Sequence, residues 1–429
     1  MAKNMEQGHE PSTFFYTFCA TQVVVPVLAW LLRIKAKPDK EFLKAEGPIV
    51  ILGNHPSYLD PINVMRLTKG RKVNFLAGEF LFRNKIWGYL FRKAGIIEIM
   101  QFAKDTSAVM GMMRVLKRKG VLVIFPEATR FVDGKSVKFD SGVAKFIKRS
   151  GAGIWFMDVN GAYLTYPRWS ESFVRLGRID ARFSSHLTPS EVKEMSLEEL
   201  QETIVKRLDY NENDYMRSAN PCHKSRKLAA GLQNIAYSCQ RCGGEFTMGF
   251  TGKDEIRCDK CGNRVRMLTS GLLEAPTKDD VTSEDLHQYT EWEKSVTRKQ
   301  LEDPNFCLKI DCKLLRKYDA VDFSHVGNGV LTVTADKFVY EGTDADPKGG
   351  IVIHKGKVKR KYRNKTIQNE TPCRMEFDIS EMKGLICEFG DHIELHGKDG
   401  TLFRFLIDGR KVLKLCEIVA IKGKLSVTA

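Results

Sequence analysis

The chain has 429 residues, of which 43% are hydrophobic, and a formal net charge of +15. This length allows two or three domains, and the apolar content is ordinary for a globular protein, which excludes a chain that is too polar to fold. The net positive charge implies that the protein binds anionic partners. Membrane surfaces, coenzyme A, acidic carrier protein and nucleic acid all fit, so charge does not choose among them.

Residues 13–34 form a long apolar stretch that has no charged side chain before Arg33. As a helix it would extend roughly 33 Å, enough to cross a hydrocarbon core. Polar residues and Pro26 dilute it, so a tilted span and a helix lying in the membrane interface both stay open. We predict a membrane anchor over residues 1–40 on the cytoplasmic face, because basic residues follow the stretch: Arg33, Lys35, Lys37 and Lys40.

The segment GNHPSYLD, residues 53–60, follows an apolar run and places Asp60 five positions after His55. In an unbroken helix Asp60 would be rotated roughly 140° away from His55. Pro56 fixes its own φ and Ser57 suits a helix N-cap, so the segment predicts a tight turn from strand to helix. There the carboxylate can bond one imidazole nitrogen while the other faces a substrate. The alternative is a surface turn with a capping role.

A His–Asp pair of this kind is the base half of a Ser-His-Asp triad. The chain has no G-x-S-x-G elbow that would present a nucleophilic serine. The missing hydroxyl is then most simply the acceptor substrate's own.

A second element, GVLVIFPEATRF, lies at residues 120–131. A buried strand over residues 121–125 is followed by Glu127, Thr129 and Arg130, at the strand's carboxyl end, where open α/β sheets build their sites. An arginine can bind a phosphate bidentately, so this group suits an anionic substrate. The alternative is an ion pair between Arg130 and Glu127 that closes a loop.

Together the two elements resemble the glycerolipid acyltransferase family, whose prototype is 1-acylglycerol-3-phosphate O-acyltransferase. The family's N-H-x-x-x-x-D block is matched by Asn54, His55 and Asp60. Its F-P-E-G-T-R block is matched except that Ala128 replaces the usual glycine. The resemblance covers roughly residues 40–215 and implies an α/β domain with a mixed sheet flanked by helices, which we place at residues 41–215.

The resemblance implies that His55 deprotonates the acceptor's hydroxyl, which then attacks the thioester carbonyl of acyl-CoA or acyl-carrier protein. Asp60 would hold the imidazole tautomer and stabilise the imidazolium. The expected acceptor is a lysophospholipid, first of all 1-acylglycerol-3-phosphate, and the product would be phosphatidate. The residues expected to bind substrate are Asn54, Glu127, Thr129 and Arg130.

The chain departs from the family at three places: in the second block, at an upstream lysine that Gly78 replaces, and at a proline of the fourth block that is missing from IWFMDV, residues 154–159. The second block usually reads G-x-I-F-I-D-R and supplies an arginine to the acceptor phosphate, but this chain has GIIEIMQ at residues 95–101. The loss weakens the case for lysophosphatidate, whose phosphate monoester carries nearly two charges. An acyltransferase of another lysophospholipid, and an inactive adaptor that binds lipid and partners, are the alternatives. The cations that could compensate are Arg83, Lys85, Arg92 and Lys93.

Two C-x-x-C knuckles follow, separated by fifteen residues: Cys239, Cys242, Cys258 and Cys261. Four thiolates at this spacing can close a tetrahedral Zn²⁺ site, and the segment resembles a zinc ribbon, placed at residues 216–270. A closed site of this kind is structural. Paired disulfides are the alternative, which a cytoplasmic location disfavours. Aromatic residues are sparse around the knuckles, which argues against nucleic-acid binding.

The remaining segments are assigned from pattern. Capping boxes at Thr188 and Ser196 are expected to close the acyltransferase domain. Residues 220–227, including Cys222 and His223, are expected to be a solvated linker, and residues 271–300 a linker with one helix.

Residues 301–429 alternate as short strands and end in a helical pattern. This order resembles a β-rich pleckstrin-homology or GRAM-like domain. The basic run at residues 354–365 could bind anionic headgroups, and a solvated hairpin tip is the alternative.

Overall fold

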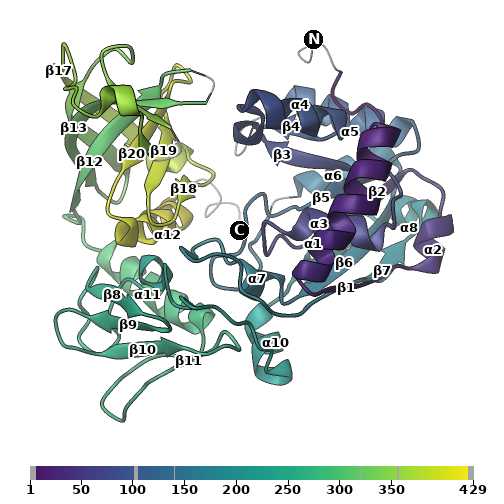
Figure 1. Cartoon of the computed structure of the whole chain (residues 1–429), viewed down its shortest axis with the longest axis horizontal. Coiled ribbons are helices and arrows are strands. Elements are labelled where there is room, and N and C mark those ends of the chain that lie inside the picture. Colours follow the sequence, from purple (N-terminus) through teal and green to yellow (C-terminus); the bar gives the residue numbers. More distant parts are fainter. Residues whose placement is uncertain (1–5, 101–104, 140, 320, 355–356, 424–429) are drawn as a thin grey trace. The chain divides into compact units, whose positions relative to one another are not determined.

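The computed structural model describes residues 6–100, 105–139, 141–319, 321–354 and 357–423 (Figure 1). The chain divides into two compact units. The first comprises Met1–Arg168, Ser172–Leu228 and Leu268–Leu272, and the second comprises Trp169–Glu171, Ala229–Met267 and Leu273–Ala429. The four cysteines of the predicted ribbon therefore belong to the same unit as the predicted carboxyl-terminal region, while the predicted domain boundaries stay predictions.

The first unit is built on a seven-stranded sheet in the order β1-β7-β6-β2-β5-β3-β4. β6 and β7 pair antiparallel, whereas β2 pairs in parallel with both β5 and β6. The sheet is thus mixed and flanked by helices, as predicted. Its strands are β1 (Ile34–Lys37), β2 (Ile49–Gly53), β3 (Asn74–Gly78), β4 (Ile97–Ile99), β5 (Val121–Ile124), β6 (Gly153–Asn160) and β7 (Ile179–Leu187).

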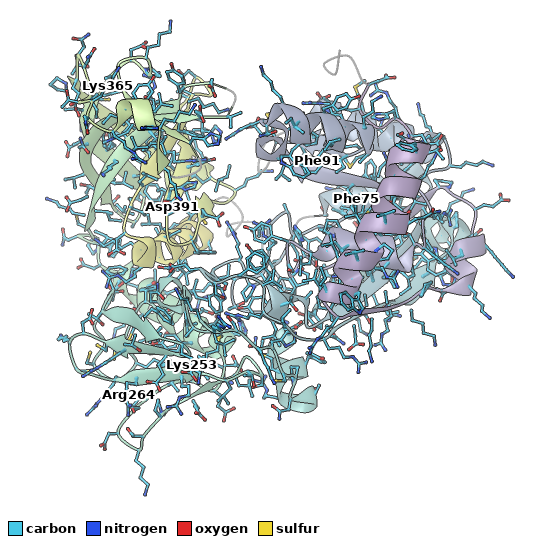
Figure 2. The ribbon with its side chains drawn as sticks, viewed as in Figure 1. Phe75, Phe91, Lys253, Arg264, Lys365 and Asp391 are labelled. Atoms are coloured by element: carbon cyan, nitrogen blue, oxygen red, sulfur yellow. The ribbon has the colours of Figure 1, made fainter. Side chains whose placement is uncertain are left out.

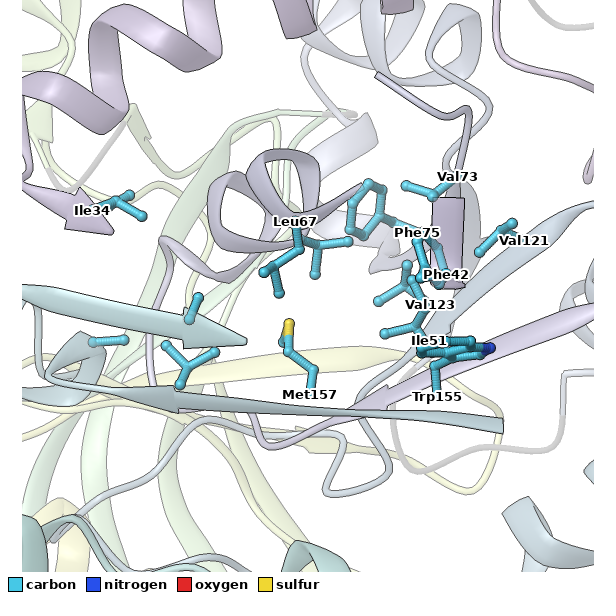
Figure 3. Close-up of a cluster of buried hydrophobic side chains, with 14 of the residues drawn as sticks. Ile34, Phe42, Ile51, Leu67, Val73, Phe75, Val121, Val123, Trp155 and Met157 are labelled. Atoms are coloured by element: carbon cyan, nitrogen blue, oxygen red, sulfur yellow. The ribbon is translucent and has the colours of Figure 1, made fainter. Parts of the chain in front are cut away.

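Both faces of this sheet are buried, which explains why its central strands are apolar runs rather than alternating patterns. Ile49 and Ile51 of β2 lie in one cluster, while Val50 and Leu52 lie in another on the opposite face. Figure 3 shows the first cluster, where Phe42 meets Trp155 edge-on with ring centroids 5.2 Å apart. Each fully buried side chain of this size contributes about 1.5–3 kcal/mol.

Helices supply the other half of each cluster. The cluster of Figure 3 takes side chains from η2 (Thr13–Val24), α1 (Val25–Leu31), α2 (Lys40–Lys44) and α3 (Asp60–Leu67). The other cluster takes them from α5 (Thr106–Lys117), α6 (Gly142–Ser150), α8 (Pro189–Glu194) and α9 (Leu197–Leu208). The remaining helices of this unit are η3 (Glu79–Phe82), α4 (Lys85–Lys93), α7 (Ala162–Thr165) and α10 (Glu212–Ala219).

The apolar amino-terminal stretch is helical along η2 and α1. It buries Tyr16 and Ala29, whereas Phe14, Val27 and Trp30 are 71%, 54% and 78% exposed. In the part of the chain that the structure describes, none of the helices combines the length and apolarity that a membrane span requires. Two of the basic residues predicted to flank an anchor, Lys35 and Lys37, instead lie in the edge strand β1, which pairs in parallel with β7.

The predicted helix starts at Thr188 and Ser196 are confirmed, because each hydroxyl accepts from the amide of the glutamate three residues later in a complete capping box. The prediction of a solvated linker over residues 220–227 is wrong for His223, which is 1% exposed although Cys222 is exposed. The His223 amide donates to the carbonyl of Thr269 at 2.8 Å, so this residue is fixed in the first unit while most of its neighbours in the segment are exposed.

The second unit contains a four-stranded sheet, β8 (Met248–Gly252), β9 (Glu255–Cys258), β10 (Arg264–Met267) and β11 (Leu273–Glu274), which carries the two knuckles. The predicted linker over residues 271–300 contains β11 and the fifteen-residue helix α11 (Leu286–Gln300). This helix buries Leu286 and Tyr289 and is part of the core rather than a connector.

A nine-stranded sheet completes the second unit, and helix α12 (Val412–Lys422) follows it, as the sequence predicts. Gly400 has φ 80° in the turn between β19 and β20. Lys355 and Gly356 of the basic run lie outside the described residues. The strands are β12 (Leu308–Lys317), β13 (Phe323–Val333), β14 (Lys337–Asp344), β15 (Ile351–His354), β16 (Lys357–Val358), β17 (Thr371–Asp378), β18 (Ile386–Glu388), β19 (His392–His396) and β20 (Leu402–Leu406).

Candidate active site and metal centre

His55 and Asp60 face each other across the turn that joins β2 to α3. The Nδ1 atom of His55 lies 2.7 Å from Oδ2 of Asp60, and the same oxygen accepts the amide of Ser57 at 3.0 Å. Helix α3 begins at Asp60, with Leu59 as its N-cap, so the prediction that Ser57 is the N-cap is wrong. The Asp60 carboxylate and the Ser57 hydroxyl, which accepts the amide of Leu59 at 3.3 Å, both hold the turn.

The surroundings of the pair fix the histidine ring. The imidazole stacks on Phe125 with centroids 4.6 Å apart and planes 13° from parallel. Its side chain is 21% exposed, while Asp60 is fully buried. Burial raises the pKa of Asp60, and the hydrogen bond from His55 and the nearby charge of Arg130 lower it. The carboxylate is thus held against the ring, which keeps Nδ1 engaged and leaves Nε2 for a substrate.

Glu127 links the two sequence blocks from inside. Its Oε1 accepts the side-chain amide of Asn54 at 2.7 Å, and its Oε2 accepts the backbone amide of His55 at 3.2 Å. The residue is 4% exposed, and burial raises its pKa to about 8 against the opposing effect of these bonds. The Asn54 amide also donates to the carbonyl of Leu208 at 2.7 Å. These contacts brace the turn that carries His55, and the prediction that Asn54 and Glu127 bind substrate stays a prediction.

Ala128 has φ 55°, in the left-handed region. An L-residue with a Cβ pays roughly 1–2 kcal/mol to adopt this conformation, and glycine adopts it freely. The glycine of the family's F-P-E-G-T-R block therefore has a backbone reason, and alanine here occupies the same strained position.

Thr129 and Arg130 continue the loop beside His55, because the amide of Phe131 donates to the His55 carbonyl at 3.2 Å. Arg130 lies over the ring of Tyr58, with Cζ 3.6 Å from the centroid. The Thr129 hydroxyl accepts from Nη1 of Arg168 at 2.9 Å.

Arg168 and Tyr58 are site residues that the sequence analysis missed. Arg168 lies beyond β6 and α7, eight positions after the end of a strand that runs parallel to β2, so no local sequence pattern singles it out. Of the four cations expected to compensate for the lost arginine, Arg83 pairs with Glu79 at 2.8 Å and Arg92 with Glu98 at 3.2 Å. These carboxylates neutralise part of the charge on η3 and α4.

The four knuckle cysteines meet in the second unit. Their sulfurs all lie within 4.8 Å of one another, with Cys239 and Cys261 3.5 Å apart and Cys242 and Cys258 3.8 Å apart. Four sulfurs around Zn²⁺ at Zn–S distances of about 2.3 Å are separated by about 3.8 Å, so the cluster fits a tetrahedral metal. Gly243 and Gly262, which follow the second cysteine of each knuckle, have φ 68° and 77°.

Backbone amides around the cluster favour thiolates. Burial raises the pKa of Cys239 to about 12, although its sulfur accepts from the amides of Arg241 and Cys242, and the sulfur of Cys258 accepts from those of Lys260 and Cys261. Amide donors to sulfur are what a metal-bound thiolate needs. The positions of the four sulfurs therefore agree with the prediction of a four-cysteine metal site.

The ribbon is held to neighbouring segments of the same unit. Arg264 of β10, labelled in Figure 2, pairs with Asp280 at 3.2 Å. The amide of Ser238, one residue before the first ligand, donates to Glu293 of α11 at 2.7 Å. The Tyr237 hydroxyl donates to Glu417 of α12 at 2.8 Å.

Two family models match the chain. The model described as acyltransferase matches residues 36–157, and the zinc-ribbon model described as the 7 kDa subunit of DNA-directed RNA polymerase matches residues 232–268. The first match includes both the His–Asp turn and the P-E-A-T-R loop, and the second includes all four cysteines. These matches and the relatives below confirm the predicted enzyme class: the chain carries an acyltransferase domain, together with a zinc ribbon.

The particular relatives are 1-acyl-sn-glycerol-3-phosphate acyltransferases. That of Streptococcus pneumoniae is 27% identical over 209 residues, which is 48% of this chain and 74% of the bacterial enzyme. The chloroplast enzyme of Arabidopsis thaliana is 24% identical over 32% of this chain and 38% of its own length. That of Brassica napus is 23% identical over 32% and 39%. The chain therefore spans well under half of the two plant enzymes.

A solved structure is also similar. The crystal structure of the 1-acyl-sn-glycerophosphate acyltransferase of Thermotoga maritima aligns with a TM-score of 0.39 and 17% identity, over 46% of this chain and 78% of that one.

Proposed function

We propose that the chain transfers a fatty acyl group from acyl-CoA or acyl-carrier protein to the free hydroxyl of 1-acylglycerol-3-phosphate, which makes phosphatidate. The observation that carries the proposal is the 2.7 Å contact between His55 and a fully buried Asp60, at the end of β2 and beside the loop that carries Arg130. The bacterial and plant relatives are named for this reaction.

The chemistry follows from the orientation of the imidazole. With Nδ1 bonded to Asp60, Nε2 of His55 takes the proton of the acceptor hydroxyl as its oxygen attacks the thioester carbonyl. Collapse of the tetrahedral intermediate breaks the C–S bond, and the imidazolium returns the proton to the departing thiolate. Asp60 stabilises the imidazolium through the hydrogen bond that it already makes. The acyl group passes directly to the acceptor, so the serine of a triad is not needed.

Each remaining site residue has a proposed part. Glu127 and Asn54 hold the turn from behind, while Thr129 and Arg130 meet the acceptor. An acceptor other than lysophosphatidate is the second candidate, and it is favoured by the sequence GIIEIMQ, which lacks the arginine of the family's second block.

The same proposal places the enzyme at the cytoplasmic face of a membrane. The exposed side chains of Phe14, Val27 and Trp30 give the amino-terminal helix an apolar face that suits the interface of a bilayer. The cations that begin β1 suit anionic headgroups. Zinc held by the four cysteines would be structural, and the carboxyl-terminal sheet would act as a pleckstrin-homology or GRAM-like module that contacts anionic lipid.

The test is acyl transfer by the purified full-length protein. Labelled palmitoyl-CoA, and separately palmitoyl-acyl-carrier protein, is supplied with lysophosphatidate and with other lysophospholipids, and diacyl product is counted. We expect product with lysophosphatidate, and a loss of at least about 10²-fold in His55→Ala because a positioned base contributes on this order. His396→Ala, which changes an exposed histidine at the end of β19, is the matched control. Absence of product with every donor and acceptor would refute the proposal.

A further inference from the structure

The acceptor's own structure sets where its phosphate must bind. In 1-acylglycerol-3-phosphate the free hydroxyl and the phosphate are on adjacent carbons, so cations that bind the phosphate must lie close to the base. The loop over residues 128–131 meets this requirement, since the Phe131 amide donates to the His55 carbonyl. The loop's own cation is Arg130.

A second guanidinium is brought to the same loop from a distant part of the chain. Arg168 donates from Nη1 to the Thr129 hydroxyl at 2.9 Å, across 39 positions of sequence. The helix that precedes Arg168, α7, is buried along its length, and the Thr165 hydroxyl donates to the Gly161 carbonyl at 2.8 Å. Arg168 therefore follows a well-packed helix, and its hydrogen bond to Thr129 brings it to the loop.

Two aromatic rings link the segments that carry the arginines. Arg130 lies 3.6 Å over the ring of Tyr58, and this ring lies 5.3 Å from that of Tyr166, two residues before Arg168. The backbone joins them as well, since the Ser57 hydroxyl donates to the Tyr166 carbonyl at 3.5 Å. Both arginines therefore flank Thr129 beside the turn that carries His55.

We propose that Arg168, together with Arg130, binds the phosphate monoester of the acceptor, and that this pair makes the enzyme prefer lysophosphatidate to lysophospholipids whose phosphate is a diester. The inference rests on the proposed acyl transfer and names its acceptor class. Two guanidinium groups offer a dianionic phosphate several charge-assisted donors, whereas a diester has one charge and fewer free oxygens. Arg168 so takes the part of the arginine that the second block lacks.

Kinetics of three variants test the proposal. In Arg168→Gln we expect the KM for lysophosphatidate to rise about 10- to 100-fold, with the KM for acyl-CoA unchanged and the KM for lysophosphatidylglycerol changed much less. Arg168→Lys, which keeps the charge but loses the planar fork, should fall between. Arg149→Gln removes an equal charge from the exposed end of α6 and should behave as wild type. A KM that is unchanged, or raised equally for both acceptors, would overturn the proposal.

A binding measurement separates this proposal from the proposed function. Isothermal titration with glycerol 3-phosphate needs no turnover and compares wild type with Arg168→Gln and Arg168→Lys. Binding that weakens in Arg168→Gln, in a wild type that acylates nothing, would support the phosphate site and refute the acyl transfer. Acylation together with equal binding by all three proteins would do the reverse. If Arg168→Gln does not fold by circular dichroism, Arg168→Lys decides both measurements.

Discussion

Asp60 is the residue on which the state of His55 depends, because it is fully buried and its carboxylate bonds Nδ1 at 2.7 Å. In Asp60→Asn the amide can offer its NH₂ group to Nδ1, which favours the tautomer with the proton on Nε2 and removes the base from the substrate side. We expect kcat to fall by roughly 10²- to 10⁴-fold with little change in KM. Steady-state kinetics of the purified variant measure this.

Asp158→Asn is the matched control for that substitution, because Asp158 pairs at the surface with Arg182 at 3.4 Å and is 32% exposed. It should leave kcat unchanged. An Asp60→Asn protein that kept wild-type kcat would show that the tautomer of His55 does not depend on this carboxylate.

Ala128 carries a backbone cost that glycine would relieve. Its φ of 55° lies in the left-handed region, so Ala128→Gly should stabilise the first unit by about 0.5–1 kcal/mol, after the greater freedom of glycine in the unfolded chain is subtracted. Urea unfolding gives the difference. Ala144→Gly, within the right-handed helix α6, should change stability in the opposite direction. Equal destabilisation by both would contradict a strained Ala128.

The contacts of some site residues can be predicted from the sequence, and those of others cannot. His55 and Asp60 are five positions apart, so turn chemistry alone brings them together. The residue type of Ser57 predicts that it is the N-cap, but α3 begins at Asp60 with Leu59 as its N-cap, and the Ser57 hydroxyl accepts the amide of Leu59 at 3.3 Å. Arg168 reaches Thr129 only through the order of β6, β2 and β5 in the sheet, which no local pattern specifies.

At the scale of elements, the segment over residues 220–227 shows how one residue of a polar stretch becomes buried. A Cβ on Gly177 would lie 2.0 Å from the His223 ring, so the histidine fills the space that this glycine leaves. Its polarity predicts a linker, and only the packing of the segment against Gly161 and Thr269 reverses that. The basic flank of the amino-terminal stretch is also predicted from its polarity. In the structure its lysines, Lys35 and Lys37, alternate with Ile34 and Ala36 in the strand β1.

His223 makes the first unit sensitive to acid. Burial, and then the charge of Arg175, lower its pKa to about 4 in the folded protein, below the usual 6.5. Between these values the unfolded chain binds a proton that the folded chain does not, so stability rises with pH through this window. Lowering the pH from 6.5 to 4 should reduce the free energy of unfolding by about 3 kcal/mol. Urea unfolding at a series of pH values measures the slope.

Substitution isolates this contribution. His223→Gln keeps a polar side chain without a titrating proton, so its stability should depend less on pH between 4 and 6.5, even if it is lower throughout. His396→Gln, at an exposed position of the second unit, should keep the wild-type slope. A slope that is the same in all three proteins would assign the acid sensitivity to other groups.

For the whole molecule, the placement of the ribbon in the second unit changes what zinc does. The first knuckle is bonded to α11 through Ser238 and Glu293 at 2.7 Å, and to α12 through Tyr237 and Glu417 at 2.8 Å. Lys414 of α12, 1% exposed, also pairs with Glu245 at 2.5 Å. Buried charges need these partners, so a knuckle that opens leaves them unpaired at a cost of several kcal/mol.

Removal of the metal should therefore loosen more than the ribbon. We expect one zinc per chain by plasma mass spectrometry, none in Cys242→Ser, and one in Cys307→Ser, which changes an exposed cysteine outside the knuckles. In the zinc-free variant, hydrogen exchange should become faster in α11 and α12 as well as in the knuckles, because the amide of Ser238 and the hydroxyl of Tyr237 no longer hold the glutamates. If α11 and α12 kept their protection without zinc, the ribbon would be an independent module, and the buried glutamates would be satisfied within the helices themselves.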